Sequence, residues 1–428
     1  MYNKVAEQIK NISAPIHEKV VSKFNKIDFD QIDVERVWEI IYLIMLAFYV
    51  GVNVLTSTMF EIAWPPYFFQ TFRSVCVTLV VIRLIIIKDM PKKKFVAMIV
   101  ISFVFLMSHY MSGYGLPIDL LILVLGAYNV DFRKILKTYI AVWSVLLVIT
   151  IIGAMTGLAE NLVYYQGEGG ERVRMALGMN YPTDLAAYVA FLMFAYVCVR
   201  DEYITYLEIG IMAGLAVVVY YITDARTNFI LMLLTVCSCF FIKKHYNCFS
   251  SFLKHKILKK IVILSYVIGC CLIWLLTIMF DPENDIWIKV DSILSGRLGF
   301  GHWALELYDF KLFGQYIVEH GLGGHVQMDD KYFFIDSSFI SIGLKYGLVF
   351  LILIVVFGCY QTKIAIEKND IFICMVIIMI ALQGFTEHHL AQYWYNPFIL
   401  MFFTNYLKNE NTYKKIYSDI GNKIIDLN

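Results

Sequence analysis

Long apolar runs, each about as long as a membrane-spanning helix, constrain this chain more than any other feature. A helix needs about 20 mostly apolar residues to cross about 30 Å of hydrocarbon. Twelve segments approach that length, namely 37–57, 68–88, 94–110, 114–130, 136–156, 180–199, 204–222, 226–242, 261–280, 337–360, 369–386 and 390–407. Because 59% of the 428 residues are hydrophobic and only 17% are charged, the sequence predicts an all-α polytopic membrane protein with about 12 transmembrane helices.

Basic residues predict how these helices are oriented. They cluster in the N-terminal segment, around 88–94, 133–137 and 243–260, and in the C-terminal tail. With 12 helices all these clusters fall on one side, which is the cytoplasmic side because short loops rich in lysine and arginine stay there. Both termini are therefore expected in the cytoplasm. The net charge of +1 provides no basic field for nucleic acid, so no nucleic-acid partner is expected.

The predicted chain has five parts. They are a cytoplasmic amphipathic segment on the inner leaflet (1–36), helices one to nine (37–280), a large extracytoplasmic loop (281–336), helices ten to twelve (337–407) and a cytoplasmic tail (408–428). A smaller extracytoplasmic loop is expected at 157–179. The large loop is rich in aromatic and aliphatic residues, which favours an ordered cap over a disordered one. Within it, 298–308 is expected to form a short helix.

Arginines on the predicted outer side break the charge bias. They are Arg172 and Arg174 in the smaller loop, Arg226 at the start of the eighth helix and Arg297 in the large loop. The guanidinium group is a planar fork of donors suited to phosphate, so four at one depth indicate a diphosphate-binding patch. Two alternatives remain. Each arginine can reach lipid phosphate, and Asp224 with Arg226 can form a helix cap and a local ion pair.

Carboxylates are expected at the same depth. Asp184 starts the sixth helix, Asp336 ends the large loop and Glu387 lies between the last two helices. Ionisable groups near a membrane are costly and indicate functional sites. Asp184 also fits an N-terminal helix cap after Pro182.

No metal site or cofactor is predicted. The nine cysteines show no ligand spacing. His388 and His389 are a weak metal signal, because adjacent histidines on a helix point to different faces and no third ligand lies nearby in sequence. Of the arginines inside the second helix, Arg73 and Arg83, we expect pairing with Asp119 or Glu208, or contact with an interface.

Five motifs follow one another in a specific order. They are R-x-R (172–174), G-x-N-x-P (178–182), T-D-A-R-T (223–227), L-S-G-R…W (294–303) and I-D-S-S-F-I-S-I-G-L-K-Y-G (335–347). In this order the chain from about 150 to 360 resembles the O-antigen and capsular polysaccharide polymerases of the Wzy type, which are similar to O-antigen ligases. Ligase relatives often place a histidine where the large loop meets the next helix. Here Asp336 takes that place, which weakens the ligase interpretation.

The resemblance implies a GT-C-like membrane glycosyltransferase at the outer face of the bacterial cytoplasmic membrane. It would join undecaprenyl-diphosphate-linked oligosaccharide repeat units into capsule, O-antigen or exopolysaccharide. Its partners would be membrane lipid, this lipid-linked donor and acceptor, and chain-length regulator and flippase proteins. By position, Arg226 and Arg297 would contact the donor diphosphate, with Arg172 and Arg174 in the same patch.

The expected reaction is a direct displacement that inverts the anomeric centre without a metal. Guanidinium groups would stabilise the departing diphosphate, and Asp336 or Glu387 would take the proton of the acceptor hydroxyl. Substrate contacts are expected from a further set of residues, namely Asp184, Asp224, Trp303 and His302. Two alternatives remain: a flippase or transporter of the same lipid-linked sugars, and an O-antigen ligase.

Overall fold

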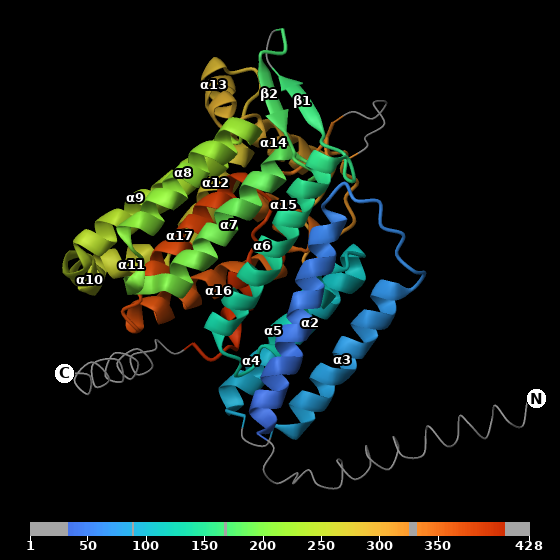
Figure 1. Ribbon diagram of the computed structural model, residues 1–428, viewed down its shortest axis with the longest axis vertical. Coiled ribbons are helices and arrows are strands. Elements are labelled where there is room, and N and C mark those ends of the chain that lie inside the picture. Colours follow the sequence, from blue (N-terminus) through green and yellow to red (C-terminus); the bar gives the residue numbers. More distant parts are fainter. Residues whose placement is uncertain (1–32, 88–89, 167–168, 325–331, 407–428) are drawn as a thin grey trace, which may run out of the picture. The chain divides into compact units, whose positions relative to one another are not determined.

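The protein is described here from a computed structural model that covers residues 33–87, 90–166, 169–324 and 332–406 (Figure 1). The chain divides into two units, residues 1–42 and 43–428. The first unit is described only over 33–42, where helix α2 (Val34–Thr56) begins. The predicted tail at 408–428 and nearly all of the predicted amphipathic segment at 1–36 lie outside the described residues.

The second unit is mostly helical. Its longer helices are α3 (Phe68–Ile86), α4 (Lys92–Ser112), α5 (Leu116–Gly126), α6 (Phe132–Thr156), α7 (Pro182–Arg200), α8 (Tyr206–Thr223), α9 (Arg226–Lys244), α12 (Ser265–Met279), α14 (Arg297–Leu307), α16 (Leu348–Glu367) and α17 (Ile371–Thr386). The shorter elements are η2 (Asp201–Tyr203), α10 (Tyr246–Lys254), α11 (Lys256–Ile263), α13 (Asp285–Ile293), α15 (Ser338–Lys345) and η3 (Pro397–Phe402).

Eight helices of the described chain are long and apolar enough to cross a membrane, or nine if the bent pair α11 and α12 counts as one. This confirms a helical, polytopic membrane protein but not the predicted number of 12 spans. The predicted fourth helix contains only the 11 residues of α5. The predicted ninth is broken by a 56° bend between α11 and α12.

The predicted tenth helix is two helices, α15 and α16, because the chain breaks at Gly347. Gly347 has a φ of 98°, and a side chain there would collide with the backbone of 312–314. That segment packs into the break. The carbonyls of Lys311 and Leu312 accept hydrogen bonds from the first two N–H groups of α16, at 3.1 Å each. The large loop is thereby fastened to the helices below it.

The predicted twelfth helix is wrong, because 387–406 is an irregular segment apart from the short η3. The segment nevertheless returns along α17. It starts at Glu387, which caps the C-terminal end of α17, and the Tyr406 hydroxyl donates to Asp370, which caps the N-terminal end. Non-helical backbone at membrane depth is tolerated where protein surrounds it, and this segment is mostly buried.

Side chains, most of them from other elements, satisfy the backbone of this irregular segment. The carbonyls of residues 390, 394, 395 and 398 accept hydrogen bonds from Asn396, Trp143, Tyr139 and Gln361, respectively. Ser338, the first residue of α15, accepts from the N–H of Leu390 and donates to the carbonyl of Glu387. Such donors replace the bonds that a helix would make internally.

Both predicted extracytoplasmic loops contain regular structure. The smaller loop holds an antiparallel hairpin that the sequence reasoning missed, formed by β1 (Val163–Gln166) and β2 (Arg172–Met175). The large loop holds α13 and α14, and α14 confirms the short helix expected at 298–308. The hairpin, α13 and α14 lie together at one end of α6–α9, and α10 lies at the opposite end (Figure 1).

Candidate functional site

The start of α7, the large loop and the turn after α17 enclose a cavity of about 290 Å³, called here the Asp336 cavity. Its lining residues are Asn180, Tyr181, Thr183, Asp184, Gly321, Leu322, Gly323, Tyr332, Phe334, Asp336 and His388. The loop at 321–324 is held in place at two points. The Tyr164 hydroxyl donates to the carbonyl of Leu322 at 2.8 Å, and the N–H of Gly324 donates to the carbonyl of Asn180 at 2.9 Å.

A buried ion pair lies close to this cavity, because both of its charges act on Asp336, although neither of its members is a lining residue. Arg297, the first residue of α14, donates to Glu387 at 2.9 Å, and their side chains are only 11% and 3% exposed. Arg297 also donates to the carbonyls of Thr386 and Leu294. Each of its three nitrogens thus has one protein acceptor. Since a guanidinium carries five N–H donors, two remain for a ligand.

Asp336 is one of two aspartates that line the cavity, the other being Asp184. It forms no ion pair with any residue of the described chain, in contrast to the nearby Glu319, which pairs with Lys345. Burial raises the pKa of Asp336 to about 7. The Arg297 guanidinium acts in the opposite direction, and the carboxylates of Glu387 and Glu319 add to the rise. A carboxylate with a pKa near the working pH is suited to accept a proton.

Arg174 belongs to the same electrostatic cluster. It is 7% exposed, donates to the carbonyl of Thr223 at 2.9 Å and lies over the ring of Tyr181, which lines the cavity. Burial raises the pKa of Glu387, and the positive charges of Arg297 and Arg174 oppose the rise. The Glu387 carboxylate is therefore affected by the charges of both guanidinium groups, one from β2 and one from α14.

The other two predicted arginines gather around Asp224 instead. Because strand residues two apart share a face, Arg172 and Arg174 both face the turn between α8 and α9, where Arg172 pairs with Asp224. Arg226 follows two residues later, is exposed, and makes no side-chain hydrogen bond or ion pair within the described ranges. The four arginines thus form an inner pair at the cavity (Arg174 and Arg297) and an outer pair at Asp224 (Arg172 and Arg226).

Asp184, His388 and His389 form a second cluster at the cavity wall. One ligand-type atom from each lies within 4.8 Å of the other two. Burial lowers the pKa of His389 to about 4, so its imidazole is neutral. Burial, and then the neighbouring His389, also lower the pKa of His388.

Trp303 and His302, predicted as substrate contacts, do not line the Asp336 cavity. Trp303 packs edge-on against Phe333, with ring centroids 4.9 Å apart. His302 lies 3.1 Å from the carbonyl of Thr277 on α12. Both residues therefore hold α14 against its neighbours in this structure, and their contact with a substrate stays a prediction.

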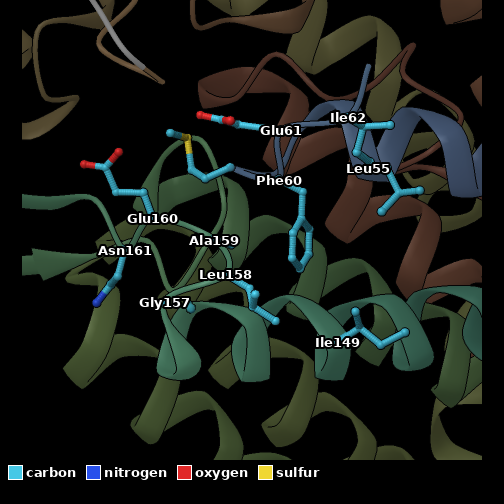
Figure 2. A pocket seen from close by; sticks show the side chains of 12 residues that line it. Leu55, Phe60, Glu61, Ile62, Ile149, Gly157, Leu158, Ala159, Glu160 and Asn161 are labelled. Atoms are coloured by element: carbon cyan, nitrogen blue, oxygen red, sulfur yellow. The ribbon is translucent and has the colours of Figure 1, made fainter. Parts of the chain in front are cut away.

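A larger cavity, the Phe60 cavity, has about 900 Å³ and lies between α2, α6 and the loops that follow them (Figure 2). It shares no lining residue with the Asp336 cavity, and neither cavity has an arginine in its lining. Figure 2 shows Phe60, Leu158 and Ile149 on the side of α6, and the carboxylates of Glu61 and Glu160 at one edge. Its chemistry does not suit a diphosphate.

Sequence reasoning missed the aromatic wall and the role of the histidine pair. Tyr181, Tyr332 and Phe334 line the cavity, but tyrosine and phenylalanine are too frequent in this chain to stand out. His388 and His389 lacked a third partner because Asp184 is about 200 residues away in sequence.

No family model, curated protein or solved structure matches this chain. The resemblance to polysaccharide polymerases thus rests on the motifs and their order alone.

Proposed function

We propose that the protein is a polysaccharide polymerase that transfers an oligosaccharide from undecaprenyl diphosphate to a second lipid-linked repeat unit. The observation that carries this proposal is the proximity of two buried arginines to Asp336, a carboxylate in the cavity wall without an ion-pair partner among the described residues. The charge of Arg297 acts on Asp336 itself, and the charges of Arg297 and Arg174 both act on Glu387. Positive groups close to a general base are what a glycosyl transfer from a diphosphate requires.

The inner arginine pair would act on the leaving group. When the bond between the anomeric carbon and the diphosphate oxygen breaks, the diphosphate gains negative charge. Fixed guanidinium groups stabilise that charge more in the transition state than in the ground state. Arg297 is suited to this role because Glu387 and two carbonyls hold its plane in place.

Asp336 would act on the acceptor. Its carboxylate accepts the proton of the attacking sugar hydroxyl as the new bond to the anomeric carbon forms. The proton ends on Asp336 and the electron pair of the broken bond ends on the diphosphate. Glu387 is less suited to this proton transfer, because its carboxylate already forms an ion pair with Arg297. We therefore assign Glu387 to positioning Arg297.

The test is chain elongation by the purified protein with a synthetic lipid-linked repeat unit. Products with two or more repeat units are expected, together with released undecaprenyl diphosphate. Proteoliposomes holding the same substrate on one side test the alternative. Translocation of the substrate without elongation would indicate a flippase and would reject the proposal. Transfer only to a lipid A-type acceptor would indicate a ligase.

A further inference from the structure

Two histidines of the described chain hold buried ring nitrogens without a hydrogen-bond partner. They are Nδ1 of His388 and Nε2 of His389. His389 is 1% exposed, so bulk water does not compensate for the missing bonds. Buried polar atoms are rarely left unsatisfied, and each exception needs an explanation.

The other nitrogen of His389 is fixed. Its Nδ1 lies 3.0 Å from Oε1 of Gln392, which makes it the donor and leaves Nε2 as a bare lone pair. A histidine that binds a metal is oriented in this way, with its second N–H donated to an oxygen. Stacking on Tyr395, with centroids 3.9 Å apart, holds the ring in this orientation. Phe334 packs edge-on against His388 in the same manner, at 4.9 Å.

Asp184 supplies a carboxyl oxygen to the same point. Its carboxylate forms no ion pair with a lysine, arginine or histidine of the described residues, and it lines the cavity together with His388. The three ligand-type atoms lie within 4.8 Å of one another. Ligand atoms of a tetrahedral zinc site lie about 3.3 Å apart, given bond lengths of about 2.0 Å. To bind an ion in this geometry, the three side chains must therefore move toward one another by about 1 Å.

We infer that Asp184, His388 and His389 bind a divalent transition-metal ion, with the fourth coordination position facing the Asp336 cavity. Two imidazoles and one carboxylate are a ligand set that zinc uses where a position stays open for water or substrate. This departs from the metal-independent reaction that the sequence leads us to expect. It does not depend on the proposed function, because the ion can be measured without any turnover.

The experiment uses the full-length protein, purified in detergent and stripped with a chelator. Titration with Co²⁺ is expected to give the visible absorption of a tetrahedral nitrogen and oxygen site, and displacement by Zn²⁺ to end at one ion per chain. His389→Ala and Asp184→Asn are expected to weaken Zn²⁺ binding at least tenfold. Gln392→Leu, which removes the partner of His389, is expected to weaken it about 10- to 100-fold. His302→Ala is the matched control and is expected to bind like the parent.

Three results would overturn the inference. The first is a stripped parent protein that takes up no Zn²⁺. The second is binding that His389→Ala and Asp184→Asn leave unchanged. The third is a Co²⁺ spectrum dominated by thiolate bands, since the nine cysteines are free. A second measurement does not depend on whether the variants fold, because it uses the parent protein alone. Zn²⁺ is expected to raise the melting temperature of the parent, and no rise would count against the site.

Discussion

The Asp336 cavity has about a third of the volume of the Phe60 cavity, about 290 Å³ against about 900 Å³, yet it is surrounded by far more charge. Two arginines, several carboxylates and two neutral histidines border or line the smaller one. The larger one has apolar walls and two glutamates at its edge (Figure 2). Volume therefore does not identify the functional site in this molecule, whereas convergent and partly unpaired polar groups do.

The strongest test of this contrast is Asp336→Asn. The amide cannot accept the proton, and a general base contributes about 10²- to 10⁴-fold to a rate. We expect elongation to fall by that factor while donor binding stays near the parent value, as measured with purified protein and a lipid-linked repeat unit. An unchanged rate would move the base to another residue, with Glu387 the first to examine.

Arg297→Gln is expected to reduce elongation about 10²- to 10³-fold, because one fixed donor to the departing diphosphate is lost. Arg133→Gln is the matched control, since Arg133 and Asp201 form an ion pair that is equally buried and also 2.9 Å long. Breaking that pair is expected to lower the melting temperature, at a cost of about 3–5 kcal/mol, and to spare the specific activity. Equal loss of specific activity in both variants would reduce Arg297 to a structural role.

The pH profile sharpens the assignment of Asp336. The reactive form is the carboxylate, whose pKa burial raises to about 7. Activity is therefore expected above this pKa and is lost as the pH falls through about 7. Glu319→Gln removes a negative charge that raises this pKa, so the acidic limb is expected to move to lower pH. A limb that does not move would show that another group titrates.

Arg226→Ala tests the outer pair. The side chain is exposed, and exposed charges contribute about 1 kcal/mol or less. We expect at most about a tenfold rise in the KM for the lipid-linked donor and little change in kcat. A loss as large as that of Arg297→Gln would place the diphosphate at Asp224 rather than in the Asp336 cavity.

The smallest effect is expected in the Phe60 cavity. Glu61→Gln changes a carboxylate at the edge of the larger cavity, and surface substitutions stay within about 0.5 kcal/mol. Elongation should thus remain within about twofold of the parent. A large loss of elongation activity would indicate that the Phe60 cavity, and not the Asp336 cavity, is the functional site.

Composition was sufficient to predict most of the helices, because each of these spans is fixed by the length of its own apolar run. Pairing of Arg73 with Asp119, one of the alternatives that the sequence left open, is confirmed at 2.7 and 2.9 Å, whereas Glu208 pairs with Arg200. A charged residue inside a span needs a partner at the same depth, and few candidates exist. The spans and this ion pair can therefore be predicted from the local sequence and from the positions of the charged residues.

The irregular segment after Glu387 and the hairpin could not be predicted in this way. The run at 390–407 is apolar enough for a helix, and only partners far away in sequence, such as Trp143 and Gln361, make the extended path possible. The cluster of Asp184 with His388 and His389 was not predicted either, because its members also come from distant parts of the sequence. Its members meet only because this segment leaves the helical path directly after α17.

The irregular segment also limits how this chain can vary. A helix absorbs an inserted residue by rotating its register, because its hydrogen bonds are repeated along its own length. Between Leu390 and Phe398 four carbonyls are each matched to one side-chain donor, and three of these donors lie on other elements. An insertion there would displace every later carbonyl from its donor and would pull Asn405 away from Val130. We therefore expect natural length variation in the turn at 281–284 and none in this stretch.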